Sequence, residues 1–127
     1  MNATAAGLLA LLFVSHFLGD FTPLATSRMQ KAKAVGRPLS PIAAHAAVHA
    51  LLVGLAVLVG AWPGAALAGM AVGIEFVTHL AIDWTRGRLG AGRPALSDPV
   101  GQAFWSVLGF DQLAHGLVLI WIAFLIL

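Results

Sequence analysis

Four long hydrophobic segments alternate with short polar stretches along the chain. The segments span residues 3–21, 41–61, 64–84 and 101–127. Each has about 20 residues or more, which is enough for an α-helix to cross roughly 30 Å of hydrocarbon. Because only helices and closed barrels satisfy their backbone hydrogen bonds in a bilayer, the pattern predicts an all-α polytopic membrane protein. We expect a single domain, residues 1–127, built as a four-transmembrane-helix bundle.

The composition supports this prediction and narrows the chemistry. The chain is 60% hydrophobic and 9% charged, whereas a soluble domain carries about 25% charged residues. It contains no cysteine, which excludes disulfides and thiolate metal ligands. The first segment has no basic residues before it and runs into polar side chains instead of a small-residue cleavage site. We therefore expect it to be a retained span and not a signal peptide.

All seven Lys and Arg residues fall in two of the three connections between the segments, and this predicts an orientation. They are Arg28, Lys31, Lys33 and Arg37 in the first connection, and Arg86, Arg88 and Arg93 in the last. The positive-inside rule places both connections in the cytoplasm and both termini outside.

Basic side chains beside the predicted spans could also hold an anionic lipid headgroup. The four candidates are Arg28, Lys31, Arg86 and Arg88. Because these residues border segments that contact the lipid bilayer, they do not indicate a nucleic-acid partner. The sequence leaves a homo-oligomer open.

Nine ionisable residues interrupt the apolar segments, mostly as pairs four residues apart. The pairs are His16 with Asp20, His45 with His49, His79 with Asp83 and Asp111 with His115, and Glu75 lies one turn before His79. This spacing places both side chains of a pair on one helix face. At 1.5 Å per residue, the first three pairs fall roughly 2–11 Å from the predicted cytoplasmic helix ends. Asp111 and His115 share this depth if the fourth helix enters the membrane near Val107. The nine groups therefore predict one shared polar site in the cytoplasmic half of the bundle.

A metal site is the simplest explanation of this cluster. No Lys or Arg lies within the predicted spans, so only a protonated His or a metal could neutralise the carboxylates. Neutral His with carboxylate suits zinc or non-haem iron, and nine groups suffice for two ions or for one ion with orienting partners. The expected ligands are His16, His49, His79 and Asp111 first, then Asp20, His45, Asp83 and His115, with Glu75 as general base or bridging carboxylate.

Such a metal would activate water for attack on an ester or phosphoester of a membrane-proximal substrate. Two alternatives come from other functional classes: a protein that conducts protons or metal ions, and a non-catalytic subunit of a membrane complex. Single histidines could also hydrogen-bond between helices without any further role. A haem is disfavoured, because carboxylates one turn from three of the histidines would spoil the apolar slot that a porphyrin needs.

The two halves of the chain repeat the same pattern. The pair that begins at His16 recurs 63 residues later at His79, and the pair that begins at His45 recurs 66 residues later at Asp111. Each half consists of a helix, a basic connection and a returning helix. We therefore expect parallel repeats that cover residues 1–62 and 64–127.

Several sequence elements are also informative in combination. They are residues 16–21 (His-Phe-Leu-Gly-Asp-Phe), the pair of His45 and His49, residues 79–83 (His-Leu-Ala-Ile-Asp) and residues 110–115 (Phe-Asp-Gln-Leu-Ala-His). Together they resemble an uncharacterised bacterial membrane family, the domain-of-unknown-function family numbered 3307. The resemblance implies a location in the bacterial inner membrane and no particular activity. A looser similarity to membrane-bound metal-dependent hydrolases favours hydrolysis.

Overall fold

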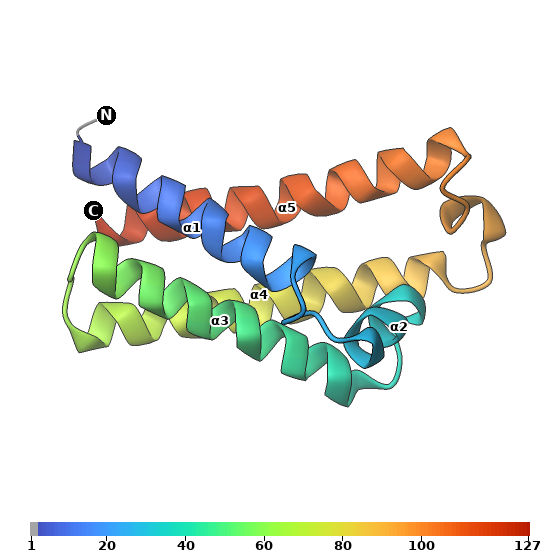
Figure 1. Cartoon of the computed structure of the whole chain (residues 1–127), viewed down its shortest axis with the longest axis horizontal. Helices are drawn as coiled ribbons and strands as arrows, with labels where there is room; N and C mark the ends of the chain where they lie inside the picture. Colours follow the sequence, from blue (N-terminus) through green and yellow to red (C-terminus); the bar gives the residue numbers. More distant parts are fainter. Residues whose placement is uncertain (1–2) are drawn as a thin grey trace.

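Helices account for nearly all of residues 3–127, the part of the chain that the computed structural model describes. Four long helices form the bundle: α1 (Ala3–Phe21), α3 (Leu39–Gly60), α4 (Ala65–Gly90) and α5 (Gln102–Ile126) (Figure 1). All four are long and apolar enough to cross a membrane. No strand occurs within residues 3–127, so the predicted all-α bundle is confirmed. The four apolar helices indicate a membrane protein.

The helices pack in a closed ring in the order α1, α3, α4, α5. Consecutive helices connected by short segments are therefore neighbours, as expected for antiparallel bundles. The pairs α1–α3 and α4–α5 correspond to the two proposed repeats, residues 1–62 and 64–127, whose duplication stays a prediction.

A short helix, α2 (Ser27–Val35), lies in the first basic connection, where the hydropathy pattern predicts no helix. It begins after Thr26, whose Oγ1 accepts a hydrogen bond from the Met29 backbone N–H at 3.4 Å, and it ends at Gly36 with φ of 67°. A side-chain cap at the start and a left-handed glycine at the end are common signals of helix boundaries. The helix packs against α3 and α4.

Two helix boundaries differ from the predicted spans by more than one residue. α4 continues to Gly90, past the expected end at residue 84, and α3 begins at Leu39 instead of residue 41. The expected end of α4 followed the length that a bilayer requires, whereas the backbone stays helical until the Gly90–Gly92 segment. The extension keeps Arg86 on a helix beside the polar cluster.

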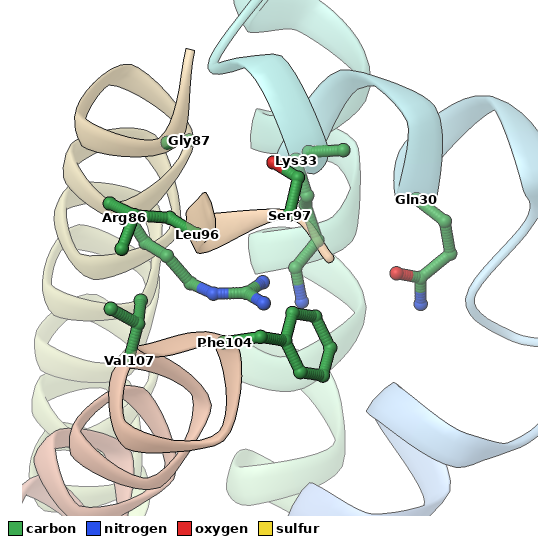
Figure 2. A pocket seen from close by; sticks show the side chains of 10 residues that line it. Gln30, Lys33, Arg86, Gly87, Leu96, Ser97, Phe104 and Val107 are labelled. Carbon is green, nitrogen blue, oxygen red and sulfur yellow. The ribbon is translucent and has the colours of Figure 1, made fainter. Parts of the chain in front are cut away.

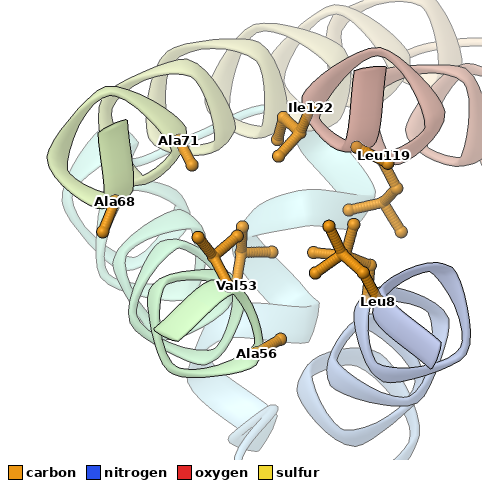
Figure 3. Close-up of a cluster of buried hydrophobic side chains, with 10 residues drawn as sticks. Leu8, Val53, Ala56, Ala68, Ala71, Leu119 and Ile122 are labelled. Atoms are coloured by element: carbon orange, nitrogen blue, oxygen red, sulfur yellow. The ribbon is translucent and has the colours of Figure 1, made fainter. Parts of the chain in front are cut away.

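Both termini of the described chain and the α3–α4 turn lie at one end of the bundle, here called the apolar end (Figure 1). Its core is a cluster of buried hydrophobic side chains from all four long helices (Figure 3). The members are Leu8, Leu12, Val53, Ala56, Val57, Ala68, Ala71, Leu119, Ile122 and Ala123. The small residues on α3 and α4 allow close helix packing, which stabilises helix association where lipid removes the hydrophobic driving force.

The opposite end, here called the basic end, contains α2, the single-turn helix η1 (Pro94–Leu96) and all seven Lys and Arg residues (Figure 1). Between the two ends, many large hydrophobic side chains point outward, including Phe17, Leu51, Leu55 and Phe124, which are between 56% and 81% exposed. An outside surface of this kind is compatible with contact to a lipid bilayer.

Candidate metal centre

All five histidines of the chain converge inside the bundle, although they come from four different helices. The ring centroids of His49 and His79 are 3.8 Å apart, and those of His79 and His115 are 4.1 Å apart. The ring centroid of His45 lies 4.6 Å from that of His49, and the ring centroid of His16 lies 5.0 Å from that of His115. The faces selected by the four-residue spacing therefore do meet in one buried cluster.

Asp20, near the end of α1, approaches three of these imidazoles. Its carboxylate oxygens lie 3.0 Å from His45 Nε2, 3.4 Å from His16 Nε2 and 3.6 Å from His49 Nε2. Two ligands of a tetrahedral zinc ion, each about 2.0–2.1 Å from the metal, are roughly 3.3 Å apart. The separations around Asp20 are close to that spacing.

Asp83 on α4 forms a second focus from the other side of the cluster. Its carboxylate lies 3.4 Å from His79 Nε2, 3.6 Å from His115 Nε2 and 3.7 Å from His45 Nε2. One turn earlier, Glu75 Oε1 lies 3.0 Å from Nδ1 of His79. His79 is thus held between two carboxylates of its own helix, one at each ring nitrogen.

Three groupings of these side chains could hold a metal ion, because their ligand atoms lie within 4.8 Å of one another. They are His16, His49, Glu75 and His79; then Asp20, His45, His49 and His79; and finally His79, Asp83 and His115. His79 belongs to all three. Of the four ligands expected first, His16, His49 and His79 share a grouping, whereas Asp111 belongs to none of the three.

Asp111 lies at the edge of the cluster. Its Oδ1 is 3.9 Å from His115 Nε2 and 3.9 Å from the Nε of Arg86. It is 7% exposed as a residue and remains buried. Its position between an imidazole and a guanidinium suits a structural or substrate-facing role as well as a ligand role.

Many of the buried nitrogen and oxygen atoms in the cluster have no hydrogen bond of good geometry within the described chain. They include Nε2 of His79 and of His115 and both ring nitrogens of His49. Unpaired polar atoms in a low-dielectric interior are costly, and native proteins usually satisfy them. Nitrogen and oxygen donors with free lone pairs, without sulfur, are the donor set that zinc and non-haem iron accept.

One residue of the cluster was not expected from the sequence: Lys33 of α2. Its Nζ donates a hydrogen bond to Asp20 Oδ1 at 2.9 Å, lies 3.2 Å from Asp83 Oδ2 and 2.9 Å from His45 Nε2. Only 6% of its side chain is exposed. The expectation that no Lys or Arg neutralises the carboxylates is therefore wrong. The reason is that α2 folds back over the basic end and inserts this side chain from outside the spans.

Gly87 explains how α2 reaches so far inward. A Cβ atom at this position would collide with the backbone of Lys33 and of Gly36. The missing side chain lets the end of α2 lie directly on α4. The signals for this helix were the capping Thr26 and the terminal Gly36, which flank a polar segment of the right length for a short helix.

Gln112 is a second residue that the sequence interpretation left without a role. Its Nε2 donates hydrogen bonds to Asp20 Oδ2 at 3.4 Å and to Asp111 Oδ2 at 3.2 Å, and its Oε1 lies 3.3 Å from His16 Nε2. It therefore links α5 to α1 through Asp20 and His16, and also holds its neighbour Asp111. The Asp-Gln-x-x-His element contained this residue, but a neutral amide does not stand out among charged neighbours.

Gly19 is required by the close packing of α1 against α3. A Cβ atom here would overlap the imidazole ring of His49. The glycine of the His-x-x-Gly-Asp-Phe element thus makes space for one of the candidate ligands.

The four basic residues expected at a lipid headgroup lie in different surroundings. Arg86 is partly buried, with 26% of its side chain exposed, and points toward the cluster. Arg28, Lys31 and Arg88 are exposed. The structure therefore brings one of the four, Arg86, next to the candidate metal centre.

Comparison with known proteins agrees with the resemblance found in the sequence motifs. No curated protein and no solved structure matches this chain. The similarity to membrane-bound metal-dependent hydrolases is not found by these comparisons and stays a prediction. A family model described as a protein of unknown function, DUF3307, matches residues 8–127, which is nearly the whole chain. The chain belongs to this family.

Proposed function

We propose that the protein binds one or two divalent metal ions, zinc or non-haem iron, within its His and carboxylate cluster. We further propose that it uses them to hydrolyse an ester or phosphoester at the membrane surface. The observation that carries the proposal is the convergence of five imidazoles from four helices, with unpaired ring nitrogens, at separations typical of ligands that share an ion.

The groupings suggest which side chains would hold the metal. His16, His49 and His79 belong to one set, and Asp20 and His45 form a second set with the same His49 and His79. An ion in the second set would displace the ammonium of Lys33, which lies 2.9 Å from both Asp20 and His45. When bound, a divalent cation supplies Lewis-acid polarisation of a substrate oxygen and activation of water. Nine candidate groups remain more than one ion needs, so the proposal includes a two-metal arrangement.

Glu75 has a contact that supports a role other than the general base expected from the sequence. Its carboxylate faces Nδ1 of His79 at 3.0 Å, and Nε2 of the same ring is left without a hydrogen bond. Carboxylates commonly orient metal-binding histidines in this way, by accepting the proton of the ring nitrogen that does not bind. Glu75 would then hold the His79 ring with Nε2 toward the ion.

For the location, we propose the bacterial inner membrane with both termini outside. The support is that all seven basic residues gather at the basic end, which the positive-inside rule places in the cytoplasm. The candidate centre would then open toward the cytoplasm.

A second candidate function, a proton relay confined to the basic half, is favoured by Lys33. Its ammonium lies 2.9 Å from Asp20 and 3.2 Å from Asp83, so the two carboxylates have a cationic partner without any metal. Chains of His and Asp are typical of proton pathways in membranes. Conduction across the whole bundle is disfavoured, because the apolar end is filled by hydrophobic side chains.

Metal analysis of the protein purified in detergent without chelators distinguishes the two candidates. Replacing His79, which belongs to all three groupings, by Ala should lower the bound metal by about an order of magnitude. The control is Leu55→Ala, a lipid-facing residue that is 59% exposed, which should leave the metal content unchanged. Wild-type protein that is well folded and free of metal would overturn the metal proposal in favour of the relay.

A further inference from the structure

A cavity opens at the basic end, next to the candidate metal centre. Its volume is about 230 Å³, and it lies between α2, α4, η1 and the start of α5. Figure 2 shows the side chains of Lys33 and Arg86 extending into it from opposite helices, with Phe104 and Ser97 beside them. Gln30 lies further along its wall.

The lining of this cavity favours an anion. It includes the guanidinium of Arg86 and the polar groups of Gln30 and Ser97, and none of the described residues that line it is acidic. The ammonium of Lys33, which also lines the cavity, is already held by Asp20 and Asp83, so Arg86 supplies the positive charge for a ligand. Asp111, the nearest carboxylate to Arg86, lies on the Nε side of that guanidinium at 3.9 Å. The terminal nitrogens of Arg86 can therefore face a ligand in the cavity. A planar guanidinium with two parallel N–H groups matches the oxygens of a phosphate or carboxylate.

A second, apolar groove continues from the same place along the outside of α4 and α5. Its volume is about 500 Å³, and its walls are mainly hydrophobic, formed by residues such as Ile82, Leu89 and Phe110. The one acidic residue among the described residues that line the groove is Asp111, beside Arg86. It shares Arg86 and Val107 with the cavity, so the two spaces meet at the guanidinium. Small-molecule sites typically occupy about 300–1,000 Å³ and combine an apolar wall with a few polar groups.

We propose that the cavity and the groove together form a binding site for an anionic phospholipid. The phosphate would lie in the cavity against Arg86, and an acyl chain would lie in the groove between α4 and α5. Charge complementarity selects the anionic headgroup, and the apolar continuation toward the bilayer selects a lipid over a soluble phosphate. This inference rests on the proposed function, because a phospholipid bound here would be the substrate that reaches Asp111 and the metal centre.

The test measures binding without turnover, in neutral detergent, with three probes: phosphatidic acid, phosphatidylcholine and inorganic phosphate. Native mass spectrometry counts bound lipid, and calorimetry measures inorganic phosphate. We expect one phosphatidic acid per chain, bound more tightly than either of the other probes. Arg86→Gln should weaken the binding of phosphatidic acid roughly tenfold, since it removes a charged contact to the phosphate and keeps most of the apolar part of the side chain.

The matched control is Arg88→Gln, which removes the same charge from an exposed position two residues along α4 and should leave the binding unchanged. Equal weakening by both substitutions would show diffuse attraction to a basic surface and overturn the proposal. A third variant, Ala81→Phe, fills the groove from an exposed position. This substitution should weaken the binding of phosphatidic acid and leave the binding of inorganic phosphate unchanged. If it changes neither, or if phosphate binds as well as the lipid, the occupant is not a lipid.

Metal content and lipid preference test the two proposals separately. Protein that contains no metal but prefers phosphatidic acid through Arg86 would refute the metal proposal and support the lipid site. Protein that carries metal, loses it in His79→Ala and shows no lipid preference would support the metal proposal and refute the lipid site.

Discussion

Replacing Lys33 by methionine removes one positive charge from between two buried carboxylates and keeps the length of the side chain. The ammonium lies 2.9 Å from Asp20 and 3.2 Å from Asp83, and the two carboxylate side chains are 7% and 0% exposed. Without a metal, the substitution leaves both anions inside the bundle without their strongest partner. We therefore expect a large loss of stability in the metal-free protein.

The magnitude follows from the burial of all three groups. Removal of one partner from a buried ion pair costs about 3–5 kcal/mol, because the remaining charge is left uncompensated. In a chain of this size, 1 kcal/mol corresponds to a change of a few degrees in the melting temperature, so we expect a decrease of roughly 10 °C or more. A divalent ion bound to the same carboxylates would replace the lost charge. The decrease should therefore be much smaller in zinc-loaded protein than in chelator-treated protein.

The assay is thermal unfolding in detergent, followed by tryptophan fluorescence, with and without chelator. Lys31→Met is the control, since it removes a charge from the exposed side of the same helix. An unchanged melting temperature of chelator-treated Lys33→Met would refute the idea that this ammonium neutralises the cluster. A loss of stability that zinc does not reduce would count against shared carboxylates and favour the proton relay.

Two further predictions concern packing and topology. Gly19→Ala should displace the His49 ring and lower the bound metal several-fold, whereas Gly69→Ala, whose Cβ would meet no atom within 4 Å, should not; equal metal contents would show that the ring position is not critical. Because the chain has no cysteine, single cysteines introduced at Lys31 and Arg93, both exposed at the basic end, should resist an impermeant thiol reagent in intact cells. A cysteine in the α3–α4 turn should be labelled, and the reverse pattern would overturn the proposed orientation.

The four spans and their meeting point were predictable because both depend on short-range sequence patterns. Hydrophobic segments of about 20 residues define spans, and a four-residue spacing defines a helix face. Because polar groups that face lipid are costly, the four polar helix faces are expected to meet at one common site. The convergence of His16, His49 and His79 follows from these rules alone.

Lys33 could not be found by the same rules. The prediction placed it outside every span, and its contacts join it to Asp20 and Asp83 over long sequence distances through a helix of only nine residues. Long-range packing of this kind depends on small details, such as the absence of a side chain at Gly87. A hydropathy profile does not detect a short polar helix. It also does not show how far a long lysine side chain can extend into the bundle.

The C-terminal end of α4 is also not predictable from hydropathy. A bilayer sets how many residues must be apolar, but it does not set where the helix stops. The turns after residue 84 carry Arg86 to the junction of the cavity and the groove, where the lipid proposal depends on it. Helix boundaries beyond the hydrocarbon are determined by capping residues and glycine.

The tightly packed apolar end acts as an electrical insulator. Ten buried hydrophobic side chains from four helices fill its core, and no ionisable side chain of residues 3–127 belongs to that core. The protein can therefore carry nine ionisable groups within its spans without discharging the gradients across the membrane. If the cluster holds a metal as proposed, the ion and any substrate would exchange with the compartment at the basic end only. The metal supply of that compartment would then decide which ion the cluster receives.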